Sequence, residues 1–175
     1  QGRPRMLLDL DREGKAVIGI CLDSPRLSGA VMDFSSNIVV ERHMDVSGID
    51  SHDALGENIR ELVGQLLDEA KRLSLQIFSV CFSVPGVVEP ETGRILNYVN
   101  MPAANGLDAK RVLAEKLDVP VYVVSLGAAI YWGALVPSQA ESRVCHVIWD
   151  LGVGMMFGRG YEVGENQFLM VRDEE

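Results

Sequence analysis

Two hydrophobic periods alternate along the chain, and the changes between them predict the order of strands and helices. Residues 16–22 form a short, nearly continuous apolar run, which is typical of a strand covered on both faces. Two more strands are expected at residues 27–34 and 37–44. Because turn-forming residues 35–37 separate them, these two strands are expected to pair as a hairpin.

An amphipathic helix is predicted from residue 53 to residue 73. Ser51 or Asp50 can cap its first turn, and Lys71 and Arg72 complement its last turn. Its apolar positions recur mostly at spacings of three and four; they are Leu55, Ile59, Leu62, Val63, Leu66, Leu67, Ala70 and Leu73.

Shorter elements are expected after this helix. In chain order they are a strand at 76–84 that ends before Pro85-Gly86, an irregular polar segment at 89–105, a short helix that Asp108 caps and that carries Val112, Leu113 and Leu117, a strand at 120–124, a helix at 127–135, and a hairpin at 144–149 and 154–157.

The order β-β-β-α-β-α-β-α predicts an α/β domain with a mixed central sheet. Residues 1–15 are expected to be an incoming linker, residues 16–136 an N-terminal α/β lobe, and residues 144–175 the beginning of a second lobe. A lobe of about thirty residues cannot build its own core. We therefore expect that the chain is truncated or that this lobe packs against a partner.

Composition narrows the possible functions. The net charge of −9 disfavours direct binding of nucleic acid, whose phosphates attract Lys and Arg. Cys21, Cys81 and Cys145 are scattered, which indicates reduced thiols in a cytoplasmic protein rather than a disulfide framework. No apolar run is long enough to span a membrane, and no His or Cys cluster has metal-ligand spacing, so no membrane, metal or cofactor is expected.

Two turns are candidate phosphate cradles, which need glycines so that the backbone can approach the anion closely and point N–H groups at it. Residues 21–25 contain no glycine, and Pro25 lacks an N–H group. Gly152 and Gly154 form a lone Gly-x-Gly pattern, a weak signal that a hairpin turn explains better than a phosphate loop. Arg94 lies in a polar segment rich in asparagine, where it suits a polar ligand such as a sugar or belongs to a solvated loop.

Several segments together resemble the ROK family (repressor, open reading frame, kinase) over nearly the whole chain. The resemblance implies an actin-like, ribonuclease H-like ATPase-type lobe. Its start is similar to the junction where the family's repressors pass from a winged helix-turn-helix into a sugar-binding domain. The similar segments are Gly2-Arg3-Pro4 with Ile18-Gly19-Ile20, residues 83–88 with 92–96, Asn100-Met101-Pro102 with Asn105 and Asp108, and residues 119–123.

The family's catalytic motifs are altered in this chain. Ser125-Leu126 stands where active members carry Asn-Asp, and leucine cannot act as the general base that deprotonates a sugar hydroxyl. Residues 21–25 replace the first phosphate loop, Asp-x-Gly-Gly-Thr, and residues 152–156 replace the second, Gly-Thr-Gly-x-Gly. Two further motif positions, a Glu and a zinc- and sugar-contacting His, are occupied here by Ala134 and Leu169.

The resemblance leaves ligand binding possible without catalysis. It implies that Gly93, Arg94, Asn105 and Ser125 line a sugar cleft, with Gly152 and Gly154 as a degenerate phosphate loop. The leading hypothesis is a carbohydrate-sensing domain of a bacterial transcriptional regulator. It would form a homodimer or higher homo-oligomer and contact DNA only through a helix-turn-helix upstream of Gln1. The alternatives are an ATP-dependent sugar kinase in which Asp23 or Asp150 replaces the base, and a scaffold that binds no ligand.

Overall fold

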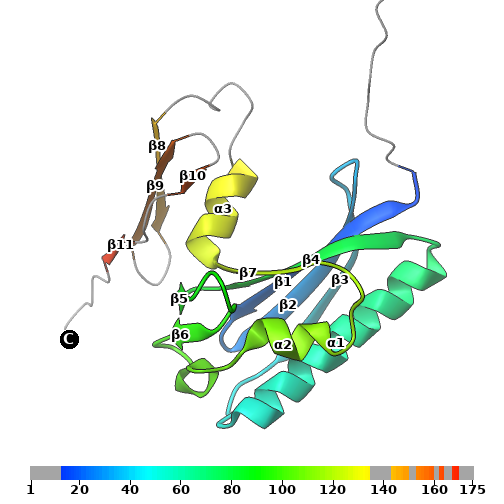
Figure 1. Cartoon of the computed structure of the whole chain (residues 1–175), viewed down its shortest axis with the longest axis horizontal. Coiled ribbons are helices and arrows are strands. Elements are labelled where there is room, and N and C mark those ends of the chain that lie inside the picture. Colours follow the sequence, from blue (N-terminus) through cyan, green and yellow to red (C-terminus); the bar gives the residue numbers. More distant parts are fainter. Residues whose placement is uncertain (1–12, 135–142, 150–152, 160–161, 164–166, 170–175) are drawn as a thin grey trace, which may run out of the picture.

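The computed structural model describes residues 13–134, 143–149, 153–159, 162–163 and 167–169. The elements of the first lobe follow the predicted order (Figure 1). They are β1 (Lys15–Asp23), β2 (Arg26–Asp33), β3 (Ile38–Asp45), α1 (His52–Arg72), β4 (Gln76–Val84), β5 (Val87–Val88), β6 (Ile95–Asn97), a 3-10 turn (Pro102–Ala104), α2 (Ala109–Ala114), β7 (Val121–Ser125) and α3 (Leu126–Ala134).

A five-stranded mixed sheet organises this lobe, in the order β3-β2-β1-β4-β7. The pairs β1–β2 and β2–β3 are antiparallel, so the predicted hairpin is confirmed. Strands β1, β4 and β7 run parallel to one another. Their carboxyl ends, at Asp23, Val84 and Ser125, therefore lie at one edge of the sheet, which is where open α/β sheets bind ligands.

The core lies between this sheet and the layer formed by α1 and α2 (Figure 1). The apolar stripe predicted for α1 is buried, with Leu62 and Leu66 fully inaccessible. Gly29 on β2 makes the close approach of α1 possible. A Cβ atom there would lie 2.6 Å from Cδ1 of Leu66 and 3.2 Å from Cδ2 of Leu62. On β1 the neighbouring Gly19 is exposed, and a Cβ atom there would meet nothing within 4 Å.

Three details differ from the sequence prediction. The segment expected to be irregular contains the short antiparallel pair β5–β6, whose strands are too brief to create a period. Helix α2 ends at Ala114, so Leu117 lies outside it, because the N–H groups of Lys116 and Leu117 bond to carbonyls only three residues back. Helix α3 begins at Leu126 rather than at residue 127.

After α3, the described residues form a separate four-stranded sheet of β8 (Arg143–Trp149), β9 (Val153–Arg159), β10 (Glu162–Val163) and β11 (Gln167–Leu169), in the region where a second lobe is expected. Strands β8 and β9 form the predicted antiparallel hairpin. The expected linker lies mostly outside the described residues, and Lys15 at its end already belongs to β1. Among the described helices, none combines the length and apolar character needed to cross a membrane.

Replacing Gly29 with Ala should lower the free energy of unfolding by about 1–3 kcal/mol, because the added methyl group overpacks the contact with α1. The matched change Gly19→Ala should alter it by no more than about 0.5 kcal/mol, because that methyl group enters open space. Urea denaturation of both variants measures the difference. Equal losses at the two positions would contradict the assignment of the sheet faces.

Candidate functional site

The candidate site is the carboxyl edge of the parallel strands together with the long connection from β4 to α2. The first connection at this edge is very short. Asp23 and Arg26 are still paired across the β1–β2 ladder, so the turn consists of Ser24 and Pro25 alone. A phosphate at such a short turn could be held only by its few backbone N–H groups, and Pro25 supplies none.

Tyr98, from the long connection, closes this turn. Its hydroxyl oxygen accepts a hydrogen bond from the backbone N–H of Ser24 at 2.9 Å. The next residue, Pro25, has no N–H group to offer, and its carbonyl oxygen accepts from the N–H of Val46. Tyr98 is only 1% exposed. The donors that a phosphate would need at this turn are therefore occupied or missing.

Asn105, one of the four predicted sugar ligands, holds this connection in shape. Its side-chain oxygen Oδ1 accepts from the N–H of Tyr98. Its backbone oxygen lies 2.7 Å from Nε2 of His52, at the start of α1. Asn105 therefore couples Tyr98 to α1, and its amide nitrogen is the part of the side chain left to contact a ligand.

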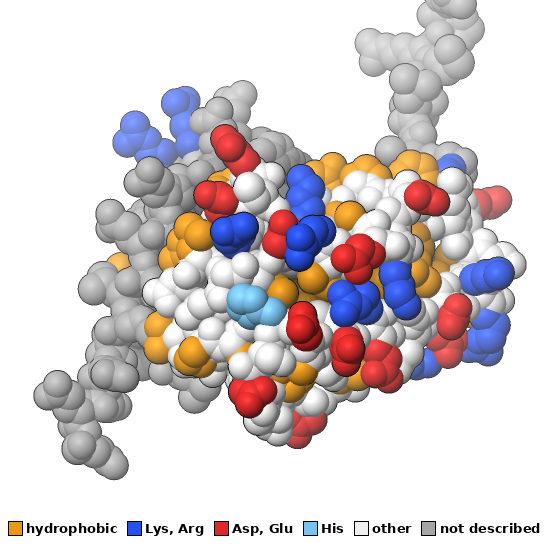
Figure 2. Space-filling model, turned by 60° about the horizontal axis from the view of Figure 1, so that its bottom comes forward, with side chains coloured by type: hydrophobic (Ala, Val, Ile, Leu, Met, Phe, Trp, Pro, Cys, Tyr) orange, Lys and Arg blue, Asp and Glu red, His pale blue; other side chains and the backbone are white. Residues whose placement is uncertain are grey.

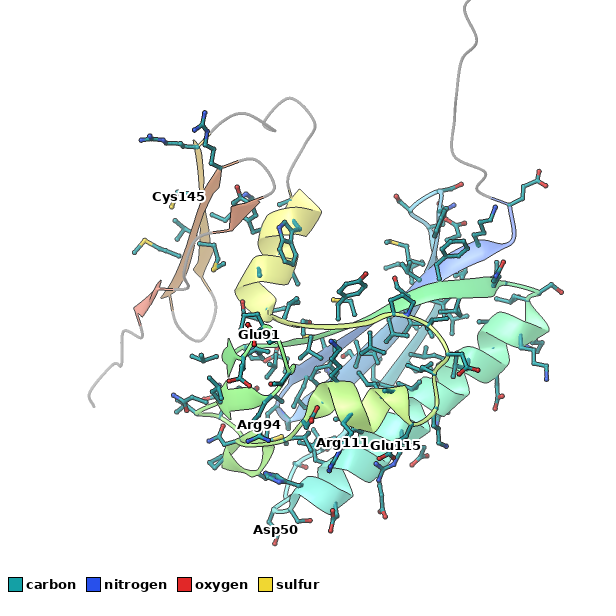
Figure 3. All side chains as sticks on the ribbon, viewed as in Figure 1. Asp50, Glu91, Arg94, Arg111, Glu115 and Cys145 are labelled. Carbon is teal, nitrogen blue, oxygen red and sulfur yellow. The ribbon has the colours of Figure 1, made fainter. Side chains whose placement is uncertain are left out.

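Gly93 and Arg94 form a tightly anchored turn in the same connection. Gly93 is buried with φ +72°, and a Cβ atom there would lie 2.9 Å from Cγ2 of Val123 on β7. Its N–H donates to the carbonyl of Glu89, and the carbonyl of Arg94 accepts from the N–H of Glu89. The N–H of Arg94 donates to Oγ1 of Thr92, whose hydroxyl in turn donates to the Glu89 carboxylate. The backbone is thus fixed while the Arg94 side chain is exposed (Figure 3).

The Arg94 side chain lines a hollow of about 320 Å³ between the start of α1 and the start of α2. Residues of three segments form its walls. They include His52, Asp53 and Arg60 of α1, Arg94 and Asp108 of the connection, and Arg111 of α2 with its C-cap residue Glu115. Neither Asn105 nor Ser125 lines it, so the four predicted residues are not gathered around this one hollow.

Ser125 lies at the end of β7, where its buried hydroxyl accepts from the N–H of Ala128 at 3.2 Å. This hydrogen bond caps the first turn of α3 and explains why the helix begins at Leu126. The leucine is half-buried and carries no titratable group.

Cys21 stands nearby on β1, directly opposite Ser83 on β4. Burial raises the pKa of the Cys21 thiol, although a hydrogen bond with Ser83 opposes this effect, so the thiol stays protonated at neutral pH. Ser83 itself donates to the carbonyl of Ile20. The two side chains at this part of the edge are therefore neutral.

The remaining predicted residues come after α3 in the sequence. Gly154 is part of β9, where it pairs with Ile148 of β8 and Phe168 of β11. Gly152 and Asp150 lie outside the described residues. One of the two predicted loop glycines is therefore in a strand, and the degenerate phosphate loop stays a prediction.

Sequence reasoning missed Tyr98, Arg60 and Arg111 as residues of the site. Arg60 and Arg111 lie on the polar sides of helices, where an arginine carries no distinguishing pattern. Tyr98 could have been noticed as a bulky aromatic residue in a polar segment, but its partner Ser24 is 74 residues away in the sequence.

The five-stranded mixed sheet with α1 and α2 packed on one face defines the chain as an α/β protein whose parallel strands end at one edge. The chain belongs to the ROK family, whose model matches residues 17–160. A curated relative from Caldicellulosiruptor sp. (strain Rt8B.4), whose name includes the words xylose repressor, is 24% identical over 169 residues. That match covers 95% of this chain and 41% of the relative, so the chain spans well under half of the relative's length.

Two solved structures show the same fold. One is a ROK family transcriptional regulator described as a homologue of the E. coli MLC protein, with a TM-score of 0.76, 17% identity, and coverage of 91% of this chain and 41% of that one. The other is a ROK family glucokinase from Streptomyces griseus in complex with glucose and AMPPNP. Its TM-score is 0.69 at 16% identity, covering 89% of this chain and 48% of that one.

Tyr98→Phe should destabilise the protein by about 0.5–1.5 kcal/mol at neutral pH, because the Ser24 N–H loses its acceptor. The pKa of Tyr98 is raised to about 12, chiefly by burial. The phenol therefore stays neutral in the folded protein between pH 10 and 12, where it ionises in the unfolded chain. Its contribution is present below pH 10 and is lost as the pH rises to 12.

Urea denaturation at neutral pH and within this alkaline range measures both effects. The wild type should lose more stability than Tyr98→Phe between pH 10 and 12. Identical pH dependence in the two proteins would contradict the buried, hydrogen-bonded position of the phenol.

Proposed function

We propose that this chain is the effector-binding and dimerisation domain of a bacterial transcriptional regulator. In this proposal it binds a sugar or sugar derivative and does not transfer phosphate. The observation that carries the proposal is the closed turn at Ser24 and Pro25. A kinase of this fold needs backbone donors there, and here Tyr98 occupies the Ser24 donor while proline removes the next one.

The loss of catalysis is also supported at the start of α3. Leu126 occupies the position of the family's catalytic aspartate, and its side chain cannot accept a proton. Asp23 is exposed at the end of β1 and is still paired through its backbone with Arg26. A substitute base would have to come from a carboxylate such as Asp23 or Asp150, which is the alternative kinase hypothesis.

Regulation is supported by the repressor relative and by the regulator of the same fold. DNA would be contacted by a helix-turn-helix outside this chain, in the cytoplasm, with the domains paired as a homodimer or higher homo-oligomer. The effector would act by closing the two lobes. It can shift the spacing of the DNA-binding domains only through a difference in its affinity for the open and closed arrangements.

Gly93, Arg94, Asn105 and Ser125 stay the proposed residues of the ligand-binding site, either as contacts or as supports. The roles differ among them. Arg94 and the amide nitrogen of Asn105 have groups free to donate, whereas Gly93 fixes the turn that carries Arg94. Ser125 caps α3 with its hydroxyl oxygen, so its contribution would come through the position of that helix.

We expect the full-length protein to form no ADP above background when it is given ATP with D-xylose, hexoses or N-acetylated hexosamines. In the same panel, one sugar or sugar derivative should bind by calorimetry and change the affinity for operator DNA in an electrophoretic shift assay. Asp23→Asn and Asp150→Asn serve as matched variants, and neither should alter binding.

Each other outcome selects a different hypothesis. Turnover that disappears in Asp23→Asn or Asp150→Asn would establish a kinase and overturn the proposal. Absence of binding across the whole panel would favour a scaffold domain instead.

A further inference from the structure

Three arginines from three separate segments converge on the hollow between α1 and α2. Arg60 comes from α1, Arg94 from the connection just before β6, and Arg111 from α2. Figure 2 shows basic and acidic side chains interleaved on this face of the molecule. This concentration of guanidinium groups stands out in a chain whose net charge is −9.

Three acidic side chains also line the hollow, and two of them have partners; the third, Asp53, lies in the first turn of α1. Asp108 accepts at 2.9 Å from the backbone N–H of Arg111, as the N-cap of α2. Glu115 lies 3.5 Å from Arg60, in a partly exposed ion pair. Within the described part of the chain, no ion pair or side-chain hydrogen bond involves the guanidinium groups of Arg94 or Arg111.

The backbone that carries these two arginines is held rigidly. A bridge pairs the backbones of Arg94 and Asp108, so the Arg94 turn is attached to the start of α2. The left-handed Gly93 packs against Val123 on the other side. Because this backbone is already ordered, binding a ligand would cost conformational entropy only in the two arginine side chains. This small cost favours binding of a small ligand.

We infer that this hollow binds the anionic group of an acidic sugar derivative, either a carboxylate or a phosphate. This inference rests on the proposed role as an effector-binding domain and specifies the chemical class of the effector. Guanidinium groups form charge-assisted, bidentate hydrogen bonds with both anions, which are stronger than bonds to neutral hydroxyls. The 21-residue helix α1 points its N-terminal, partly positive end into the same hollow. The volume of about 320 Å³ suits one small ligand.

The test uses calorimetry on the full-length protein with D-glucose, D-gluconate, D-glucose 6-phosphate and inorganic phosphate. At least one of the two acidic sugars should bind with an affinity at least about tenfold higher than that of glucose. This difference in affinity should become smaller at high salt, because salt screens the charges. Arg94→Gln and Arg111→Gln should each weaken that binding about tenfold or more. Arg143→Gln, an exposed arginine on β8 away from the hollow, is the matched control and should bind like the wild type.

The same set of ligands also distinguishes a phosphate-binding site from a carboxylate-binding site. Tight binding of glucose 6-phosphate with competition by inorganic phosphate identifies a phosphate site, whereas tight binding of gluconate alone identifies a carboxylate site. Glucose binding as tightly as both acidic sugars, or normal binding of the acidic sugars by Arg94→Gln and Arg111→Gln, overturns the inference while leaving an effector-binding domain intact. Failure of the acidic sugars to bind also overturns it, and the wider panel with operator DNA then decides the proposed function. Thermal melts of each variant verify that the fold is retained.

Discussion

The hydrogen bond from the Ser24 N–H to the Tyr98 hydroxyl is the contact on which the geometry of the site depends. It joins the first hairpin turn to a connection 74 residues further along the chain. From Tyr98 the linkage continues through Asn105 to His52 at the start of α1. Because Tyr98 is buried, breaking this linkage would leave polar groups without partners in a poorly solvated place. The sheet edge, the connection and the first helix are therefore positioned together.

In the proposed function, the same linkage would let one fold lose phosphate chemistry and keep a place for a ligand. The Tyr98 hydroxyl takes a donor that a phosphate loop would use, and it draws the connection down onto the sheet edge. The other end of that connection carries Arg94 on a turn fixed by Gly93 and by the bridge to Asp108. Closing the turn and holding the arginine in place are two consequences of one packed loop.

The sequence predicted most of the first lobe because its signals are local. The stripe of α1, the buried strands and the hairpin each depend on periods or turns within a few residues. The residues of the candidate site were harder to predict from the sequence. Arg94 was identified from its polar segment and, together with Gly93, through a family resemblance. Neither signal could indicate that Arg60 and Arg111 would join Arg94 from two helices. Contacts between distant segments, such as Ser24 with Tyr98, leave no local pattern, and short strands such as β5 and β6 show no period.

An effector held in this lobe needs a physical route to the second lobe if it is to change the arrangement of the whole protein. Helix α3 offers one, because Ser125 caps its start at the ligand edge. Further along, the fully buried Tyr131 packs edge-on against the ring of His146 on β8, with centroids 5.0 Å apart, in a cluster with the buried Met156 of β9. In the proposed function, a shift of Ser125 would move the start of α3 and, through that helix, this cluster. Packed clusters adopt discrete arrangements rather than deforming smoothly, so such a shift could be converted into one of two lobe positions.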